Sequence, residues 1–151
     1  MPYLCGMLTR KAKYAIKALV YLAQENRMTP IRQIAEQTRI PRKFLEAILL
    51  DLKIHGITDS KQGIAGGYFL LRDANDIHLA EIYRLLDGPI ALVPCVSLNF
   101  YKPCDDCVDE AHCAIRTVMY TVRDAMIQVL EKITIGQMAT GAAMMPQKMT
   151  L

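Results

Sequence analysis

Residues 31–57 read IRQIAEQTRIPRKFLEAILLDLKIHGI, and this stretch decides the fold. Apolar residues recur at helical spacing in two runs within it, 31–38 and 41–55. Thr29-Pro30 predicts an N-cap followed by proline at the first helical position of the first run. Only a tight break separates the two runs. The stretch therefore predicts a helix-turn-helix unit.

The second of these helices has a defined inner face and a defined end. Gly56 follows its last turn and is a typical residue just beyond a helix C-terminus. A helix of this kind can fill the major groove of DNA, with its N-terminal residues at the base edges. Its expected inward-facing residues are Leu45, Ile48, Leu49 and Leu52.

The flanking segments complete a winged helix. A helix is predicted over residues 8–24, and a β-hairpin with a glycine-rich tip over 57–71. A further helix is predicted over 78–86 and ends at Gly88-Pro89. The expected fold class is mostly α: a winged helix-turn-helix with a two-stranded β wing and a long C-terminal dimerisation helix.

The residue types of the helix-turn-helix and hairpin suit DNA. Pro41, Arg42 and Lys43 begin the second helix, where the two cations can reach a guanine edge or phosphates. The wing glycines allow a close approach of the backbone to the sugar–phosphate wall, and Lys61 adds charge. Arg10 and Lys11, which begin the first helix, can hold neighbouring phosphates.

The charge is distributed unevenly along the chain. Residues 1–72 contain twelve Lys or Arg and five Asp or Glu, a net charge of +7, whereas residues 73–151 carry −4. A basic first half points to a polyanionic partner. Helix-turn-helix units also serve as packing modules, and basic side chains also cover ordinary surfaces. The combination of motif and charge favours double-stranded DNA as the partner.

Composition limits the class of protein. The 151 residues are 52% hydrophobic and 22% charged, which is typical of a single soluble domain. The apolar stretch YAIKALVYLA is interrupted by Lys17 and has helical periodicity, and no run is long enough to span a membrane. We expect a cytoplasmic protein, with no membrane partner. The sequence has no Ser/His/Asp set, phosphate loop or nucleotide motif, so we expect no enzyme.

A long helix is predicted over residues 111–133. Its apolar residues recur every three or four positions and form a narrow seam. Such a stripe can pack on the chain's own core, but a small domain offers this helix little to cover. We therefore expect a homodimer joined through Ile115, Val118, Val122, Met126, Val129 and Ile133.

Four cysteines with the spacing C-x8-C-x2-C-x5-C precede and begin this helix: Cys95, Cys104, Cys107 and Cys113. A cytoplasmic chain disfavours disulfides, which leaves an iron–sulfur cluster, zinc, a reversible thiol switch, or a loop without a ligand. Structural zinc sites usually pair two short C-x2–4-C motifs, and only one such motif, Cys104/Cys107, is present here. Nearby carboxylates repel a metal-free thiolate, which disfavours the thiol switch, whereas a bound cation would offset that repulsion. We favour a cluster, with zinc as the alternative.

The chain resembles the Rrf2 family of bacterial winged-helix transcription regulators. The resemblance covers about residues 8–133 and is most specific in IP-x-x-[YF]-LE-x-IL and GGY-x-L. The matching stretches are LTRKAKYAIKALVYLA at 8–23, the helix-turn-helix at 31–57, SKQGIAGGYFLL at 60–71 and LLDGPI at 85–90.

The resemblance implies a homodimer on a palindromic operator, and in some members an iron–sulfur cluster held by three cysteines. These map to Cys95, Cys107 and Cys113. Glu46 matches a glutamate of that group, and its carboxylate can accept a hydrogen bond from a cytosine amine. The residues expected at DNA are Arg10, Lys11, Pro41, Arg42, Lys43, Glu46, Ser60, Lys61, Gly63, Gly66, Gly67 and Tyr68.

The chain departs from the family pattern at several positions. Arg116 stands where cluster regulators often have a histidine, and Lys13 stands where others have a carboxylate that reaches the partner subunit's cluster. Gln62 replaces a wing arginine. Cys104 is an additional cysteine, and we expect it to be the fourth ligand.

These observations predict four regions: a DNA-binding domain at 1–90, a cysteine-rich sensor loop at 91–110, a dimerisation helix at 111–135 and a flexible tail at 136–151. The predicted function is a repressor whose operator binding depends on a two-iron or four-iron cluster. The alternatives are the same fold regulated by a protein partner or by thiol oxidation, and a small redox enzyme using Cys104 and Cys107.

Overall fold

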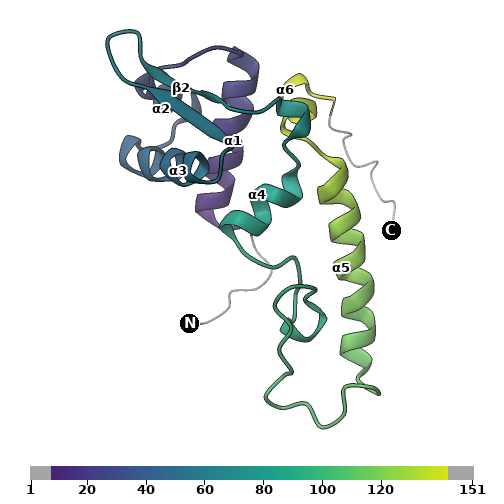
Figure 1. Cartoon of the computed structure of the whole chain (residues 1–151). Helices are drawn as coiled ribbons and strands as arrows, with labels where there is room; N and C mark the ends of the chain where they lie inside the picture. The colour runs from purple at the N-terminus through teal and green to yellow at the C-terminus, as the bar shows by residue number, and fades with distance from the viewer. Residues whose placement is uncertain (1–7, 143–151) are drawn as a thin grey trace.

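The fold is a winged helix-turn-helix beside which one long helix stands apart, as the fold-class prediction expects (Figure 1). The structure is a computed structural model and describes residues 8–142. In chain order its elements are α1 (Arg10–Glu25), α2 (Ile31–Thr38), α3 (Arg42–Ile54), β1 (Thr58–Lys61), β2 (Gly67–Leu70), the 3-10 turn η1 (Ala74–Asp76), α4 (Leu79–Leu86), the 3-10 turn η2 (Pro94–Val96), α5 (Ala114–Lys132) and α6 (Ile135–Thr140).

The main core lies where α1, α2 and α3 meet. The apolar stripe of α3 is fully buried there, as its spacing predicts. Leu19 of α1 and Ile34 of α2 are also fully buried against it. Burial of one such side chain is worth about 1.5–3 kcal/mol, so this cluster is what holds the three helices at fixed angles.

The ends of the helices follow local chemistry. Thr9 caps α1 by accepting a hydrogen bond from the Ala12 N–H at 3.1 Å. Arg39 ends α2 in the left-handed conformation, with φ 56°, and its side chain is exposed. Gly56 has φ 69° just beyond α3, which confirms it as the helix stop.

The cap expected at Thr29 is wrong by one residue, because Pro30 is the N-cap of α2. A residue before proline prefers an extended backbone, and Thr29 uses that geometry to pair with the wing. It exchanges two backbone hydrogen bonds with Tyr68, each 2.9 Å long. The wing is therefore fastened to the start of α2.

The wing is a two-stranded antiparallel hairpin. β1 and β2 pair from Thr58 with Leu70 to Lys61 with Gly67, and five residues form the tip between them. Thr58 is fully buried and its hydroxyl donates to the Leu49 carbonyl of α3. The hairpin predicted over 57–71 is confirmed, and its base is anchored on the helix-turn-helix.

The long helix is shorter at its start than expected. Cys113 caps α5, accepting the Arg116 N–H at 3.5 Å, so the helix begins at Ala114 rather than at residue 111. Residues 111–112 form a turn instead, and the Asp109 carboxylate accepts the Ala111 N–H.

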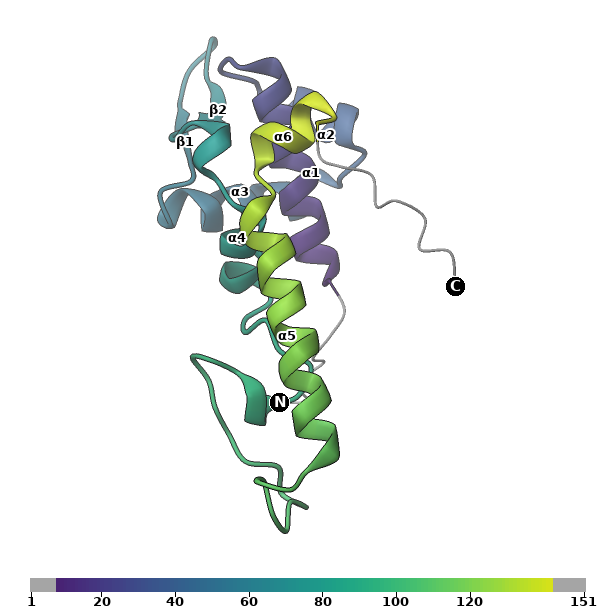
Figure 2. The same ribbon diagram turned by 90° about the vertical axis from the view of Figure 1, so that its right-hand side faces the viewer.

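The tail expected to be flexible from residue 136 is wrong for its first part, because α6 forms there. Thr134 and Gln137 form a capping box, and Ile135 is fully buried in the main core. Figure 2 shows α6 lying against α1 while α5 extends away below. Residues 143–151, the rest of that tail, lie outside the described residues, as does Cys5.

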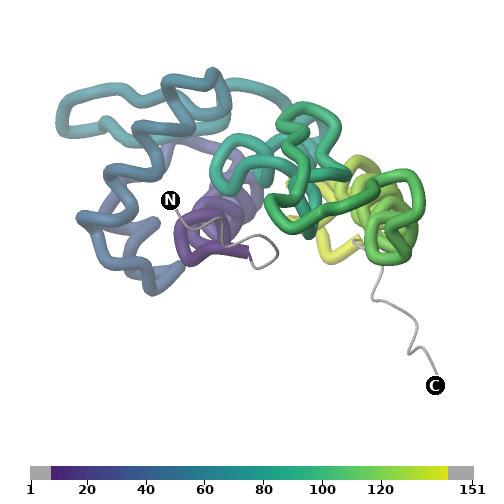
Figure 3. Tube along the Cα trace, turned by 90° about the horizontal axis from the view of Figure 1, so that it is seen from below, coloured from purple at the N-terminus to yellow at the C-terminus, as the bar shows by residue number. Residues whose placement is uncertain are grey.

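A loop over residues 87–113, here called the cysteine loop, runs from α4 to the far end of α5. Seen from below, it lies between the winged helix and α5 (Figure 3). Ala91, Cys95 and Val96 are buried in it and pack against Met119 and Tyr120 of α5. Within residues 8–142, no helix is long and apolar enough to cross a membrane.

Candidate DNA interface and cysteine loop

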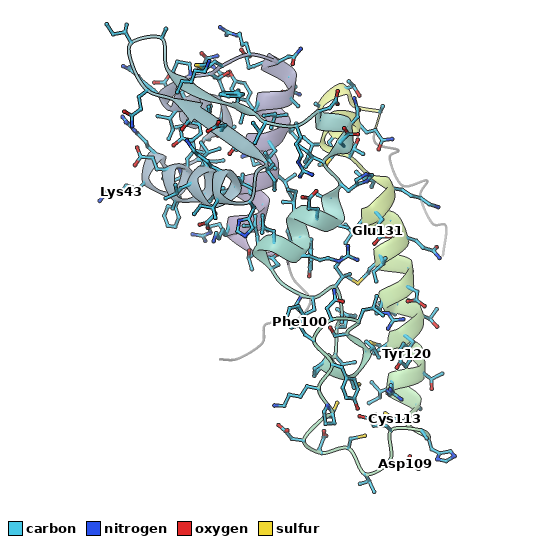
Figure 4. All side chains as sticks on the ribbon, in the orientation of Figure 1. Lys43, Phe100, Asp109, Cys113, Tyr120 and Glu131 are labelled. Carbon is cyan, nitrogen blue, oxygen red and sulfur yellow. The ribbon has the colours of Figure 1, made fainter. Side chains whose placement is uncertain are left out.

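The start of α3 presents two cations. Pro41 is the N-cap and is exposed, and Arg42 and Lys43 follow it in the first turn. The Arg42 Nε donates to Glu46 Oε1 at 2.8 Å, so these two predicted DNA contacts form one pair along the helix. Lys43 extends away from α3 with no salt bridge among the described residues (Figure 4).

Lys53, which the sequence analysis did not select, connects the wing to α3. Its Nζ lies 2.9 Å from both Asp59 Oδ1 and Ser60 Oγ of β1. The hydrogen bond from Lys53, and then that from the Ser60 N–H, lowers the pKa of the Asp59 carboxyl. Ser60 is thus engaged with the protein, while Lys61 at the end of β1 is exposed.

The wing glycines are required by close contacts. A Cβ on Gly66 would lie 2.3 Å from the Lys61 carbonyl oxygen, and one on Gly67 would lie 2.4 Å from that of Thr29. Gly63 has φ 114°, which disfavours any side chain. Tyr68 is half-buried against the main core, so its observed contacts are structural.

The start of α1 lies beside α3. Lys11 Nζ is 2.5 Å from Asp51 Oδ2, and Arg10 is exposed one residue earlier. Lys11 therefore lies beside the second half of α3, away from the predicted cations of its first turn, and Lys61 lies at the end of β1.

Two of the four thiols of the cysteine loop are in direct contact. Cys95 is buried in η2, and a hydrogen bond with its side chain raises the pKa of the Cys104 thiol. Partial burial and the negative charges of Cys95, Asp106 and Cys113 raise it further. The additional cysteine therefore lies among the family-type cysteines rather than away from them.

The other two thiols lie near the start of α5. Burial, followed by the charges of Cys113, Glu110 and Cys104, raises the pKa of Cys107. Cys113 caps α5 at the end remote from α6, and Asp109 lies in the loop next to it (Figure 4). Each thiol thus interacts with at least one other, yet no three Cys, His, Asp or Glu side chains in residues 8–142 stand in a metal-binding arrangement.

A group of polar side chains that the sequence analysis missed ties the loop to α5. Arg116 and Arg123 lie over the Tyr120 ring, at 5.1 and 4.7 Å from its centroid. Tyr101 donates to Glu110 at 2.5 Å, and Glu110 pairs with Arg116 at 3.6 Å. The spacing of Arg116, Tyr120 and Arg123 at i, i+4 and i+7 was the signal available in the sequence.

The apolar stripe of α5 is divided. Ile115, Val118 and Val129 are exposed, at 66%, 56% and 55%, whereas Met126 packs on α4. An apolar groove of about 540 Å³ runs between α1, α4 and α5, lined by Leu8, Ile16, Leu79, Tyr83, Ala125, Met126, Val129 and Leu130.

A helix-turn-helix with an anchored wing and cations at its exposed end defines a winged-helix DNA-binding protein. Comparison with known proteins gives the family. The model of the Rrf2 family, described as iron-dependent transcriptional regulators, matches residues 8–141. The chain therefore belongs to the Rrf2 family of transcriptional regulators, which are not enzymes.

Individual relatives agree with this assignment. An rrf2-like HTH-type transcriptional regulator of Rhodobacter capsulatus is 44% identical over 137 residues, covering 87% of this chain and 91% of its own. CymR, the global cysteine regulator of B. subtilis, superposes with a TM-score of 0.75 at 26% identity, covering 90% of this chain and 98% of its own. IscR of T. potens superposes with a TM-score of 0.70 at 25% identity, covering 94% and 93%.

Proposed function

We propose that the protein is a homodimeric repressor that binds a palindromic operator, and that an iron–sulfur cluster on the cysteine loop controls this binding. The observation that carries the proposal is a loop with four cysteines, of which Cys95 and Cys104 pack against α5, the helix that leads back to the winged helix. The helix α5 thus connects the DNA-binding end of the chain with the end that receives the signal.

Three elements support the DNA-binding part. The first turn of α3 offers Arg42 and Lys43, with Glu46 paired to Arg42. The wing and the start of α1 add Lys61 and Arg10 as exposed cations. We assign base reading to α3 and phosphate contacts to α1 and the wing.

The exposed stripe of α5 supports the dimer. Ile115, Val118 and Val129 lie on an apolar face that the described residues leave open, and the apolar groove beside α4 continues it. We assign a second copy of the chain to this surface, with the two α5 helices packed along their stripes. Leu8 and Tyr83 extend the interface beyond the residues that the helical pattern indicates.

The number and type of the cysteines support a cluster, although their side chains do not converge on one point in this structure. Four sulfurs are the usual complement for iron–sulfur clusters, and Cys104 packs against the group of buried residues that includes Cys95. The hydrogen bond with Cys95 raises the pKa of Cys104 and burial raises that of Cys107, and a bound cation would favour the thiolate form of both. Cys113 stands at a helix N-terminus, which favours negative charge. When bound, the cluster would supply a site that gains or loses electrons or iron in response to the cell.

The functional division of the chain follows from these assignments. The DNA-binding unit reaches residue 90, the sensor segment occupies 91–113, and α5 joins the two subunits. Because Ile135 is part of the main core, α6 belongs to the winged helix rather than to a tail. A shift of α5 relative to the sensor segment would therefore reach the winged helix through α6 as well as α4.

Anaerobic purification of the protein tests the cluster. We expect iron and acid-labile sulfide in comparable amounts, a visible absorption band that oxygen bleaches, and altered DNA affinity after bleaching. The Cys104→Ala variant should lose most of the iron, and Cys5→Ala should not. Zinc without sulfide would contradict the cluster, and a metal-free protein that copurifies with an enzyme would favour a protein partner as the signal.

A further inference from the structure

A pocket of about 550 Å³, here called the wing pocket, lies where the wing meets α1 and α6. The end of α1, β2, η1 and α6 line it, and Figure 1 shows α1, β2 and α6 coming together at the upper end of the molecule. None of the lining residues belongs to α3 or to the cysteine loop, and only Lys61 is also an expected DNA contact. Pockets of this volume commonly hold small organic ligands.

Part of the lining of the wing pocket is apolar. Leu22 of α1 is buried in the main core, and Leu70 of β2 and Ala74 of η1 pack against that core. Phe69 of β2 and Ala139 of α6 add further apolar surface. A ligand with an apolar body would remove this surface from water, which favours its binding.

The charged side chains that line the wing pocket are mostly basic. They are Arg27, Lys61 and Arg72, against the single carboxylate of Asp73. Asp73 Oδ1 already accepts hydrogen bonds from the N–H and the side-chain amide of Asn75, at 2.8 and 3.1 Å. Lys61 is exposed and forms no salt bridge with another described residue. The lining therefore favours a negatively charged ligand.

The two arginines of the lining are held by exchangeable pairs. Arg27 donates to Glu25 at 3.0 and 2.7 Å, and Arg72 Nη2 donates to Glu81 Oε1 at 2.6 Å. Both pairs are partly exposed to water, so each is weak. The Arg72 Nε is buried with no hydrogen-bond partner among the described residues, which costs free energy. The Arg72 guanidinium would therefore gain hydrogen bonds by turning towards an acceptor in the pocket.

We propose that the wing pocket binds a small organic anion, a carboxylate or a phosphate ester with an apolar body. Arg72 binds the anionic group, because its planar fork of donors matches both carboxylate and phosphate oxygens. Lys61 and Arg27 add positive potential, and the apolar body lies against Leu22 and Leu70. The site uses no cysteine, so it goes beyond the proposed function and does not depend on a cluster.

The wing pocket connects the wing with α6. Arg72 lies two residues beyond β2, and Gly136 of α6 packs so closely on η1 that a Cβ there would lie 2.3 Å from Asn75 Oδ1. Only Ile133 and Thr134 separate α6 from α5. An anion that contacts both the wing side and α6 favours one placement of the wing, so its binding changes the affinity for DNA.

Backbone amide chemical shifts measured by NMR during titration with benzoate, phenyl phosphate and the neutral benzyl alcohol test the site. We expect millimolar concentrations of either anion to shift the amides of Asn26, Asp73 and Gly136, and the alcohol to have little effect. Arg72→Gln should weaken the binding of both anions by about tenfold or more, the usual effect of losing one hydrogen bond to a charged group.

Glu81→Gln is the matched control, because it breaks the same ion pair but retains the Arg72 guanidinium. Its affinity for the two anions should equal or exceed that of the wild type. Equal affinities in Arg72→Gln and the wild type would overturn the site. Shifts confined to the first turn of α3, or no shifts with either anion, would overturn it as well.

Binding of a mixed-sequence DNA duplex separates the pocket from a DNA contact. Without anions, Arg72→Gln should bind the duplex with the salt dependence of the wild type. A slope smaller in magnitude by about 0.9 would assign Arg72 to a DNA phosphate instead. Phenyl phosphate should change the duplex affinity of the wild type but not of Arg72→Gln, and an unchanged wild-type affinity would overturn the coupling to the wing. A wild type that binds no DNA would contradict the proposed function and leave the anion site in place.

Discussion

The side chain of Arg42 illustrates how the residues proposed to read DNA are held in the free protein. It is paired with Glu46, as Lys11 is with Asp51. Exposed pairs of this kind are worth about 0–1 kcal/mol, so DNA phosphates or bases can replace them at small cost. Lys43 has no salt bridge among the described residues, so it can contact DNA without breaking one. The pairs therefore align the cations without preventing their transfer to DNA.

Replacing Arg42 and Lys43 together with alanine should weaken DNA binding strongly. Each lost phosphate contact reduces the magnitude of the slope of log affinity against log salt concentration by about 0.9. If both side chains contact phosphates, the slope of the double variant should therefore be smaller in magnitude by about 2. Fluorescence anisotropy over a range of salt concentrations measures this. The double variant Lys102→Ala/Lys132→Ala has the same net charge and should bind as the wild type does. An unchanged operator affinity for Arg42→Ala/Lys43→Ala would remove α3 from the interface.

Asp59 should titrate below the ordinary range of aspartate. The hydrogen bond from Lys53 stabilises the ionised carboxylate, which lowers the folded-state pKa. This contribution to stability is present above the unfolded-state pKa and is lost as pH falls through the lowered folded-state pKa. Carboxyl chemical shifts measured by NMR should show the low midpoint, and Lys53→Ala should move it upward. A midpoint that Lys53→Ala leaves unchanged would show that the pair does not form in solution.

At the scale of single elements, the apolar pattern of the sequence identified most helices but not their junctions. The stripe of α3 and the stop at Gly56 were predictable because burial and left-handed backbone follow from residue type. The cap at Thr29 was not, because its partner Tyr68 is distant in sequence. The helix α6 was missed because its stretch is rich in Gly, Ala and Met and has no apolar period. The capping pair Thr134 and Gln137 was the available signal.

In the candidate site, too, the features set by local sequence were predictable and those set by long-range contacts were not. The spacing of the four cysteines and the cations of α3 could be found from the sequence, because both depend on local order. The stack of Arg116, Tyr120 and Arg123 was missed, because its significance comes from contacts with Glu110 and Val96 in another segment. Long-range contacts of this kind leave little trace in a single sequence.

The attachment of the wing to α2 should depend on Gly67. A Cβ there would lie 2.4 Å from the Thr29 carbonyl oxygen, and backbone cannot move aside as a flexible side chain can. Gly67→Ala should lower the free energy of unfolding by about 1–3 kcal/mol, the usual cost of overpacking, as measured by urea unfolding. The exposed tip substitution Ala65→Ser should have little effect. Equal stabilities of the two variants would contradict the proposed attachment of the wing to α2.

At the scale of the whole molecule, the charge distribution matches the arrangement of the elements. The basic part of the chain forms most of the winged helix, and the acidic part includes the cysteine loop and α5, which extend away from it. Asp87 joins the two parts by accepting hydrogen bonds from the Thr9 N–H at 2.9 Å and from the Thr9 hydroxyl. A dimer through α5 would place two winged helices on the same assembly, with the two sensor segments near its axis.

Charge placed in the α5 stripe should separate the proposed dimer. Val118→Glu/Val129→Glu should sediment as a monomer in analytical ultracentrifugation and retain the helical circular dichroism of the wild type, because both side chains are exposed in a single chain. Thr117→Glu/Gln128→Glu, at exposed positions outside the stripe, should remain dimeric. A wild-type protein that sediments as a monomer at micromolar concentration would exclude the dimer.

The central claim, that two copies of this winged helix read one operator, is tested most directly by selecting bound sequences from a pool of random DNA duplexes with the anaerobically purified protein. The account predicts an enriched, two-fold symmetric site whose half-sites lie about one helical turn, or a multiple of it, apart. Enrichment of no sequence, or of a single asymmetric half-site, would contradict it.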